Sequence, residues 1–191
     1  MNLILASQSP RRRELMGLYH IPFTACSADI DESMDASLPP EQEVARVSLK
    51  KAQAVERGAE DIVVAADTIV VCAGKILGKP KSAAQAAEML RLLSGRDHQV
   101  MTGLSVLRGE TAATVTEVTH IYFRELSERE IARYVESGEP MDKAGAYGIQ
   151  GGAALFVRRL EGDYYNVMGL PVCRLWEILK GIAPEIMEEW V

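Results

Sequence analysis

The sequence predicts an α/β fold, because segments of strand character and capped helical segments alternate along its 191 residues. Two observations carry this prediction. Residues 62–71 form a continuous apolar, β-branched run of strand length, which is typical of a buried strand. Ser9, Ser82 and Ser127 each stand directly before a helical pattern, where a helix N-cap is expected.

The remaining elements follow from apolar periodicity and from the glycines and prolines that punctuate it. A hairpin turn is expected at 72–75, and residues 139–152 form a glycine-rich loop. The expected helices span residues 9–19, 41–57, 82–93, 127–138 and 171–181. The expected strands span residues 3–6, a short segment before Asp29, and residues 62–71, 98–107, 111–123, 153–159 and 164–168.

Composition narrows the class of protein. The length suits one large domain or two small lobes, and 48% hydrophobic with 25% charged residues is ordinary for a globular protein. A net charge of −6 argues against a nucleic-acid polymer as the partner. Three widely spaced cysteines without a CxxC suggest neither a disulfide framework nor a zinc site. Neither a signal peptide nor a membrane-spanning run is evident, so a cytoplasmic location with no membrane partner is expected.

Asp67 and Thr68 interrupt the apolar run at 62–71. A buried carboxylate is unfavourable unless a cation or hydrogen bonds compensate it, so Asp67 requires a partner from elsewhere in the chain. It could face solvent at a kink, or it could bind a metal or activate water. The strand by itself does not separate these interpretations.

Basic side chains stand at two unusual positions. The run at 11–13 lies in the first turn of a helix, where positive charge opposes the helix dipole, and together with free N–H groups it describes an anion site. A solvated basic helix end is the alternative. Lys51 falls within the apolar stripe of the helix at 41–57, beside Val47 and Val55. It either extends to the surface or meets an anion.

Three loops add further candidates. Asp29, Asp31 and Glu32 form an acidic loop that is either solvated surface or a source of oxygen ligands for a cation. Lys79 lies in a loop framed by glycine and proline. The loop at 139–152 combines four glycines with charged and polar side chains, but it fits neither the Walker A pattern nor GxGxxG.

Over almost its whole length the chain resembles the Maf (septum-formation-inhibitor-like) nucleotide pyrophosphatase family. The two most specific matching segments are Leu3–Arg12 and Gly138–Gly151. Shorter matches connect them: Asp31-Glu32, Lys51-Ala52, Ala66-Asp67-Thr68, Gly78-Lys79-Pro80, Leu93-Ser94-Gly95 and Thr102-Gly103.

The resemblance implies a single domain over 1–191 in which helices flank a mixed, elongated β-sheet. Two lobes would surround a central cleft, as in inosine-triphosphate pyrophosphatases. It also implies hydrolysis of a nucleoside triphosphate to the monophosphate and pyrophosphate with a divalent cation, Mg²⁺ or Mn²⁺. Arg11, Thr68 and Gln150 match the positions that distinguish substrate branches, and these residue types are similar to the dTTP/UTP branch, with CTP and modified pyrimidine nucleotides as further candidates.

The resemblance also assigns roles to individual residues. Asp67 matches the proton acceptor and Glu32 a polar cleft position, and our own hypothesis is that these two carboxylates also hold the metal ion. The other matched catalytic positions are Lys51, Lys79 and Arg12. The substrate-binding positions are Ser7, Ser9, Arg11, Thr68, Lys143 and Gln150.

Two other functions are compatible with such a pocket: a nucleotide-binding regulator of cell division with little catalysis, and a nucleotidyltransferase. Release of pyrophosphate from dTTP or UTP would separate the first from an enzyme. The nucleotidyltransferase would need an acceptor substrate, and the glycine-rich loop argues against it. Ile186, Met187 and Trp190 make the tail apolar enough to dock on the body or a partner, so a homodimer is left open.

Overall fold

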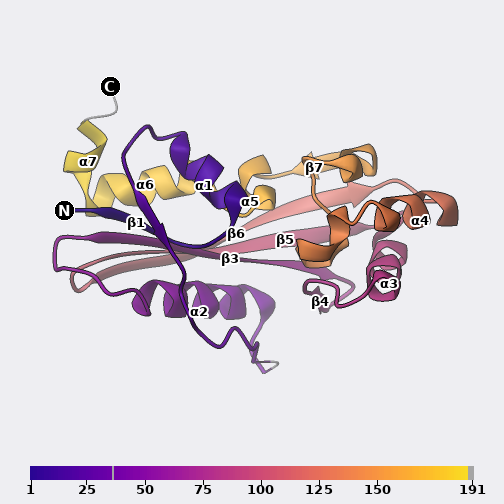
Figure 1. Ribbon diagram of the computed structural model, residues 1–191, viewed down its shortest axis with the longest axis horizontal. Coiled ribbons are helices and arrows are strands. Elements are labelled where there is room, and N and C mark those ends of the chain that lie inside the picture. The colour runs from indigo at the N-terminus through magenta and orange to yellow at the C-terminus, as the bar shows by residue number, and fades with distance from the viewer. Residues whose placement is uncertain (36, 189–191) are drawn as a thin grey trace. The chain divides into compact units, whose positions relative to one another are not determined.

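The computed structural model describes residues 1–35 and 37–188, with side chains described through Ile186 (Figure 1). The chain divides into two compact units. Unit 1 comprises Met1–Asp67, Thr102–Glu117 and Gly169–Val191, and unit 2 comprises Thr68–Met101 and Val118–Met168.

A mixed β-sheet is the framework of the fold. Among the described residues its seven strands follow the order β2-β1-β3-β5-β6-β7, and β4 pairs with β3. β1 runs parallel to β2 and β3, whereas β4 is antiparallel to β3 and β7 is antiparallel to β6. The strands are β1 (Leu3–Ala6), β2 (Thr24–Cys26), β3 (Ile62–Cys72), β4 (Lys75–Leu77), β5 (Asp97–Arg108), β6 (Thr111–Phe123) and β7 (Val157–Glu161). This arrangement confirms the predicted α/β class.

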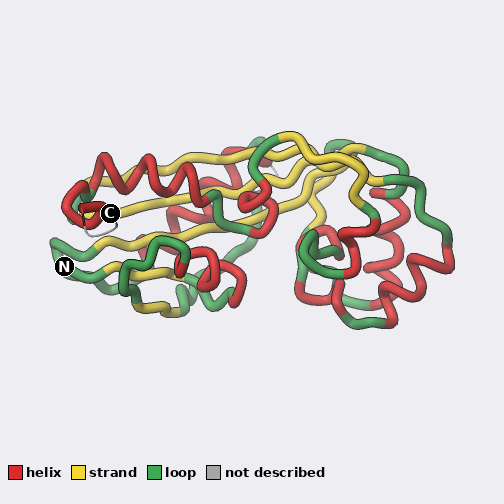
Figure 2. The backbone as a smooth tube through the Cα atoms, turned by 90° about the horizontal axis from the view of Figure 1, so that it is seen from above, coloured by secondary structure: helices red, strands yellow, loops and turns green. Residues whose placement is uncertain are grey.

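The three longest strands, β3, β5 and β6, take part in both units, so the chain passes from one unit to the other along them (Figures 1 and 2). Unit 1 adds helices α1 (Pro10–Gly17), α2 (Pro40–Gln53), α6 (Val172–Ile182) and α7 (Pro184–Glu188). Unit 2 adds α3 (Ala83–Leu93), α4 (Glu128–Glu136), α5 (Tyr164–Met168) and the short 3₁₀ helices η1 (Glu139–Asp142), η2 (Ala144–Ala146) and η3 (Gly152–Leu155).

The predicted N-caps are confirmed. The Ser9, Ser82 and Ser127 side chains accept hydrogen bonds from the backbone of the third residue beyond each of them. Ser127 forms a complete capping box with Glu130. At Ser82 only half of such a box is present, because the Gln85 side chain accepts from the Lys81 amide rather than from the Ser82 amide.

The predicted strand at 164–168 is wrong, because these residues form the short helix α5. The Asp163 carboxylate accepts from the Tyr165 amide and so holds the start of that helix. Asn166 in α5 then donates to the Val100 carbonyl and the Thr119 hydroxyl. The strand expected at 153–159 begins later, at Val157, after the turn of η3.

Two other boundaries differ from expectation. α2 ends at Gln53, before the predicted Arg57, and Val55 then packs in the core of unit 1. In the tail, Ile186 on α7 is buried, whereas the Met187 side chain and Trp190 lie outside what the structure describes. No helix in the described part of the chain combines the length and apolarity needed to span a bilayer.

A glycine sets the distance between α2 and β5 in unit 1. A Cβ atom on Gly103 would lie 2.2 Å from the Val44 carbonyl oxygen and 2.8 Å from the Ala45 nitrogen. Both are backbone atoms of α2, so the contact cannot be relieved by a side-chain rotation.

We therefore expect Gly103→Ala to lower the free energy of unfolding by about 3 kcal/mol, because the helix must move off the sheet. Gly17→Ala is the matched control, since no atom outside its chain neighbours and the backbone of its own helix lies within 4 Å of its Cβ position. Urea unfolding followed by circular dichroism measures both variants. Equal stability of the two would contradict this account of the packing.

An aromatic cluster fills the interior of unit 2. The His98 ring makes edge contacts with Phe123 and Tyr147, and its Nε2 lies 2.7 Å from the Tyr147 hydroxyl. Only 2% of His98 is exposed, and burial lowers the pKa of its imidazole to about 4. The neutral ring is therefore part of the folded core.

Because the unfolded chain protonates His98 near pH 6.5, this group's stabilisation is complete above that pH and is lost as the pH falls toward 4. Between pH 7 and pH 4.5 we expect the parent to lose about 2 kcal/mol more unfolding free energy than His98→Gln. Urea titrations at the two pH values test this difference. Identical losses would show that His98 does not titrate as described.

Candidate functional site

The position of Asp67 follows from the alternation of side chains along β3. Val63 and Ala65 pack against Ala52 and Val55, which belong to α2 and the turn after it. Asp67 continues this series two residues further on, so its side chain lies on the face that α2 covers. The residue is 8% exposed, which excludes a solvent-facing carboxylate at a kink.

Lys51 supplies the cation that buried Asp67 requires. Its Nζ donates a hydrogen bond to Asp67 Oδ1 at 2.7 Å and forms an ion pair with Glu32 Oε1 at 2.9 Å. Lys51 is buried and meets anions, which is the second of the two outcomes that its place in the apolar stripe left open, whereas the Glu32 side chain is 58% exposed. An ammonium has three N–H donors, so these two contacts leave one for a further oxygen.

Ser7, Ser9 and Arg12 form a second polar group in unit 1, between β1 and α1. Arg12 Nε donates to the Gly169 carbonyl at 2.7 Å, and its Nη1 donates to Ser7 Oγ at 3.4 Å. Ser7 Oγ also accepts from the Ser9 amide, while Ser9 Oγ caps α1 through the Arg12 amide. The local turn and Gly169 thus orient the guanidinium.

The negative charges of Asp67 and Glu32, the two carboxylates that contact Lys51, also act on the Arg12 guanidinium. Burial lowers the pKa of Arg12, and the charge of Asp67 opposes that effect. The positive charge of neighbouring Arg11 adds to the lowering. Arg13 differs from both, because it is exposed and donates to the Gln8 side chain. Within the basic run at 11–13, Arg12 is thus close enough to Asp67 and Glu32 to be affected by their charge, whereas Arg13 contacts Gln8 instead.

In unit 2, two candidate lysines lie on loops that contact each other. The Gly145 amide donates to the Gly78 carbonyl at 3.1 Å, which joins the loop of Lys79 to the glycine-rich segment. Lys79 is exposed and has no ion-pair partner among residues 1–35 and 37–186. Lys143 is half-buried, and its Nζ donates to Asp142 Oδ1 and to the Glu139 carbonyl.

The glycine-rich segment is braced from within by Glu139. Its carboxylate accepts from the Tyr134 hydroxyl at 2.9 Å and from the Gly152 amide at 3.0 Å. The Tyr134 oxygen in turn accepts from the Gly148 amide. A Cβ on Gly151 would lie 2.0 Å from Glu139 Oε1, so that glycine accommodates the carboxylate. The missing side chain of Gly151 thus allows the backbone to approach a carboxylate of unit 2 itself.

The other two candidates of unit 2 are Gln150, which lies within this braced segment, and Thr68, which lies on β3. Gln150 is exposed in the turn before η3, and half-buried Thr68 directly follows Asp67 on β3. The candidate residues are thus distributed over both units. Unit 1 carries Ser7, Ser9, Arg11, Arg12, Glu32, Lys51 and Asp67, and unit 2 carries Thr68, Lys79, Lys143 and Gln150.

The two carboxylates beside Lys51 suit only one form of metal site. Among the described residues, no group of three or more histidine, cysteine, aspartate or glutamate side chains could hold an ion. Mg²⁺, however, commonly takes one or two carboxylates together with substrate phosphates and water. Asp67 and Glu32, each within 3 Å of the same nitrogen, fit that form.

Sequence reasoning missed an ion pair next to this cluster. Arg46 binds Glu43 on α2 and also donates to the Ser33 carbonyl, one residue beyond Glu32. The i,i+3 spacing of Glu43 and Arg46 was the available signal, but it is typical of ordinary pairs on a helix surface. Glu43 is instead fully buried.

Comparison with known proteins gives the family. A family model described as Maf-like protein matches residues 2–182. The chain belongs to this family. A dTTP/UTP pyrophosphatase of Geobacillus sp. (strain WCH70) is 50% identical over 182 residues, which cover 95% of this chain and 98% of the relative. A dTTP/UTP pyrophosphatase of Moorella thermoacetica is 51% identical and is covered to 93%, as is this chain.

Solved structures confirm the class of fold. The Staphylococcus aureus Ham1 protein aligns with a TM-score of 0.51 and 14% identity, over 95% of this chain and 100% of its own. A HAM1 protein from Coxiella burnetii aligns with a TM-score of 0.53 and 14% identity, over 95% and 99%. At such low identity the likeness concerns the fold alone.

Replacing Lys51 tests its part in holding Asp67. In Lys51→Met the carboxylate stays buried without its cation, so we expect the unfolding free energy to fall by about 3 kcal/mol. Adding Asp67→Asn in the same chain should restore part of that loss, because an amide needs no counter-charge. Urea unfolding measures each variant.

Lys50→Met is the matched control, since Lys50 is the exposed neighbour on the same helix. An equal effect of the substitutions at Lys50 and Lys51, or no recovery in the double variant, would rule out the ion pair as the source of the loss.

Proposed function

We propose that this chain hydrolyses dTTP and UTP to the nucleoside monophosphate and pyrophosphate. The structural observation that carries the proposal is the Lys51–Asp67 ion pair, buried on the α2 face of β3 with Glu32 at its exposed side. The names of the relatives at about half identity give the substrate class.

Cations near Asp67 would receive the triphosphate. Lys51 has an N–H donor left after its two carboxylate contacts, and Arg12 is oriented by Ser7 and the Gly169 carbonyl. Positive groups that are already fixed in place stabilise charge on a phosphoryl group without reorganisation during the reaction. Lys79 and Lys143 of unit 2 complete the proposed set of phosphate-binding side chains.

Asp67 would act on water. Lys51 occupies Oδ1, so Oδ2 can accept a hydrogen bond from a water molecule and hold it for attack on the α-phosphorus. The water oxygen forms the new bond to that phosphorus, and the bond to the bridging oxygen before the β-phosphorus breaks. Pyrophosphate leaves, and the water proton passes to Asp67 or to solvent.

A divalent cation, Mg²⁺ or Mn²⁺, is part of the proposal. Asp67 and Glu32 would hold it together with substrate oxygens, as their fit to a two-carboxylate site suggests. When bound, such a cation neutralises phosphate charge and lowers the pKa of coordinated water. Without a divalent metal ion, the Lys51 ammonium would hold the two carboxylates close together.

Arg11, Thr68 and Gln150 would recognise the pyrimidine nucleotide. The Gln150 amide and the Thr68 hydroxyl can each donate and accept hydrogen bonds, which suits the polar edge of thymine or uracil. A site that binds such an edge discriminates against bases that leave its polar groups unpaired. CTP and modified pyrimidine nucleotides are further candidate substrates of the same site.

The names of the relatives favour catalysis over a purely regulatory role, since they denote pyrophosphatases. A nucleotide-binding regulator would bind dTTP or UTP without turnover. A cytoplasmic location, where the free nucleotide pool lies, completes the proposal, and pairing of two copies through the tail stays a prediction.

A nucleotide panel tests the function directly. We expect dTTP and UTP to be hydrolysed fastest when dTTP, UTP, CTP, dATP and GTP are supplied with Mg²⁺ or Mn²⁺, and activity to be lost with a chelator. Anion-exchange chromatography should show the monophosphate and pyrophosphate as products. Release of orthophosphate with the diphosphate, or binding without hydrolysis, would refute the proposal.

Asp67→Asn tests the acidic group. The amide preserves the shape but cannot take a proton, so we expect turnover of dTTP to fall by about 100-fold or more in a protein that remains folded. Asp97→Asn is the control, because Asp97 is an exposed aspartate of unit 2 outside the candidate site. Turnover by Asp67→Asn close to that of the parent would remove Asp67 from the mechanism.

A further inference from the structure

The segment Asp31–Asp35, which we term the acidic strap, has no regular secondary structure and all of its residues are exposed. It nevertheless carries Glu32, whose carboxylate meets buried Lys51. Met34, the one apolar residue of the strap, is 38% exposed, so a single partly buried apolar side chain helps to hold the strap. An exposed polar segment loses conformational entropy when it is ordered, and specific contacts must compensate that loss.

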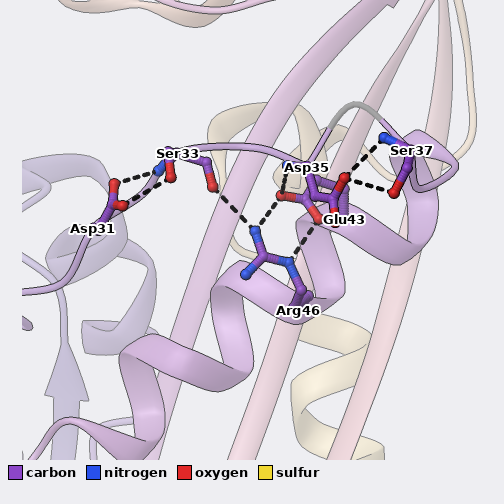
Figure 3. Close-up of polar contacts among 6 residues, drawn as sticks. All are labelled: Asp31, Ser33, Asp35, Ser37, Glu43 and Arg46. Carbon is purple, nitrogen blue, oxygen red and sulfur yellow. Dashed lines mark hydrogen bonds and ion pairs between the residues drawn. The ribbon is translucent and has the colours of Figure 1, made fainter.

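Contacts with α2 order the strap at three points. The Asp35 amide donates to Glu43 Oε1 at 2.7 Å, Arg46 Nη2 donates to the Ser33 carbonyl at 3.0 Å, and Lys51 pairs with Glu32. The strap residues decrease in number as the helix residues increase, so the strap runs antiparallel along α2. Figure 3 shows the first two attachments, with the Arg46 guanidinium between the strap and the Glu43 carboxylate.

The ion pair between Glu43 and Arg46 is the central attachment of the strap to α2. Arg46 Nε donates to Glu43 Oε2 at 2.7 Å, and its Nη2 donates to Glu43 Oε1. Glu43 is fully buried, so its carboxylate depends on Arg46 for its charge partner. The hydrogen bonds from Arg46 lower the pKa of Glu43, which keeps this carboxylate ionised in neutral solution.

Local turns explain why Glu32 alone of the three strap acids reaches the cluster. The Asp31 carboxylate accepts from the Ser33 amide and hydroxyl, and the Asp35 carboxylate accepts from the same two groups of Ser37 (Figure 3). Both aspartates are thus engaged within the loop. Glu32 is the acid directed to Lys51 and, through it, to Asp67.

We propose that Glu43 and Arg46 are positioning residues that hold the acidic strap on α2 and thereby place the Glu32 carboxylate beside Lys51 and Asp67. This inference rests on the proposed function for its catalytic consequence. The geometric part concerns only the strap and α2. Misplacement of a reactive group by about 1 Å can lower a rate by about 100-fold, so loss of the Glu43–Arg46 attachment should lower the measured rate of nucleotide hydrolysis.

The first test reads the strap itself. We expect Arg46→Gln to raise hydrogen exchange at backbone amides of the strap by about tenfold more than at the amides of β3, where any rise reports the overall loss of stability from breaking the pair with buried Glu43. Arg174→Gln is the matched control, because it removes another arginine of unit 1 that pairs with Glu117 and Glu177. Unchanged exchange in the strap of Arg46→Gln would overturn the proposal.

The second test asks whether Arg46 acts through Glu32. We expect Arg46→Gln to lower kcat/KM for dTTP by about tenfold to 100-fold, and by less than about twofold when Glu32→Gln is already present. Arg46→Lys should retain part of the activity, because it keeps the charge but loses the fork that spans Glu43 and Ser33. Circular dichroism at the assay temperature checks that each variant is folded.

The outcomes separate the two proposals. If the fold-reductions in kcat/KM caused by Arg46→Gln and by Glu32→Gln multiply in the double variant, Arg46 acts independently of Glu32. That result would overturn the positioning role. So would full activity of Glu32→Gln together with a loss in Arg46→Gln. If the parent chain releases no pyrophosphate from any nucleotide, the proposed function fails, and the exchange measurement alone decides whether Arg46 holds the strap.

Discussion

The ammonium of Lys51 is the contact on which the arrangement of unit 1 depends. β3 places Asp67 on a face that is otherwise apolar, and a carboxylate is tolerated there only because a cation reaches it from α2. The same cation attracts Glu32 from an exposed loop. One nitrogen thus joins a strand, a helix and a loop, and the packing of α2 on the sheet becomes inseparable from the chemistry proposed for the site.

That dependence links stability to function. The Lys51–Asp67 pair is held in place by the close approach of α2 to β5 at Gly103, where no side chain fits. A change that lifts the helix also withdraws the cation from the carboxylate. Unit 2 uses a comparable device in a different form, since the Glu139 carboxylate and the Tyr134 hydroxyl brace the segment that carries Lys143 and Gln150.

Periodicity alone was sufficient to place the central features. Alternation and helical spacing located Asp67 within a buried strand and Lys51 on the inward face of a helix, and serine caps located three helix starts. Contacts between distant residues could not be anticipated. The Ser33–Arg46 bond and the Arg12–Gly169 bond leave no pattern in the sequence, because each joins a side chain to a backbone carbonyl of arbitrary residue type. The helix at 164–168 was missed because its residues suit a strand and Asp163 alone signals the turn.

The two outermost strands of the sheet share a property that bears on the protein in a crowded solution. β2 has three residues, and β7 carries the exposed arginines at 158 and 159 and the exposed Glu161 among its five. An open strand edge can recruit a strand from another molecule, and brevity and charge are two ways of preventing it. The path from β2 to β7 therefore ends on both sides in poor templates for fibril growth, and β4, which pairs with β3 outside this path, is also only three residues long.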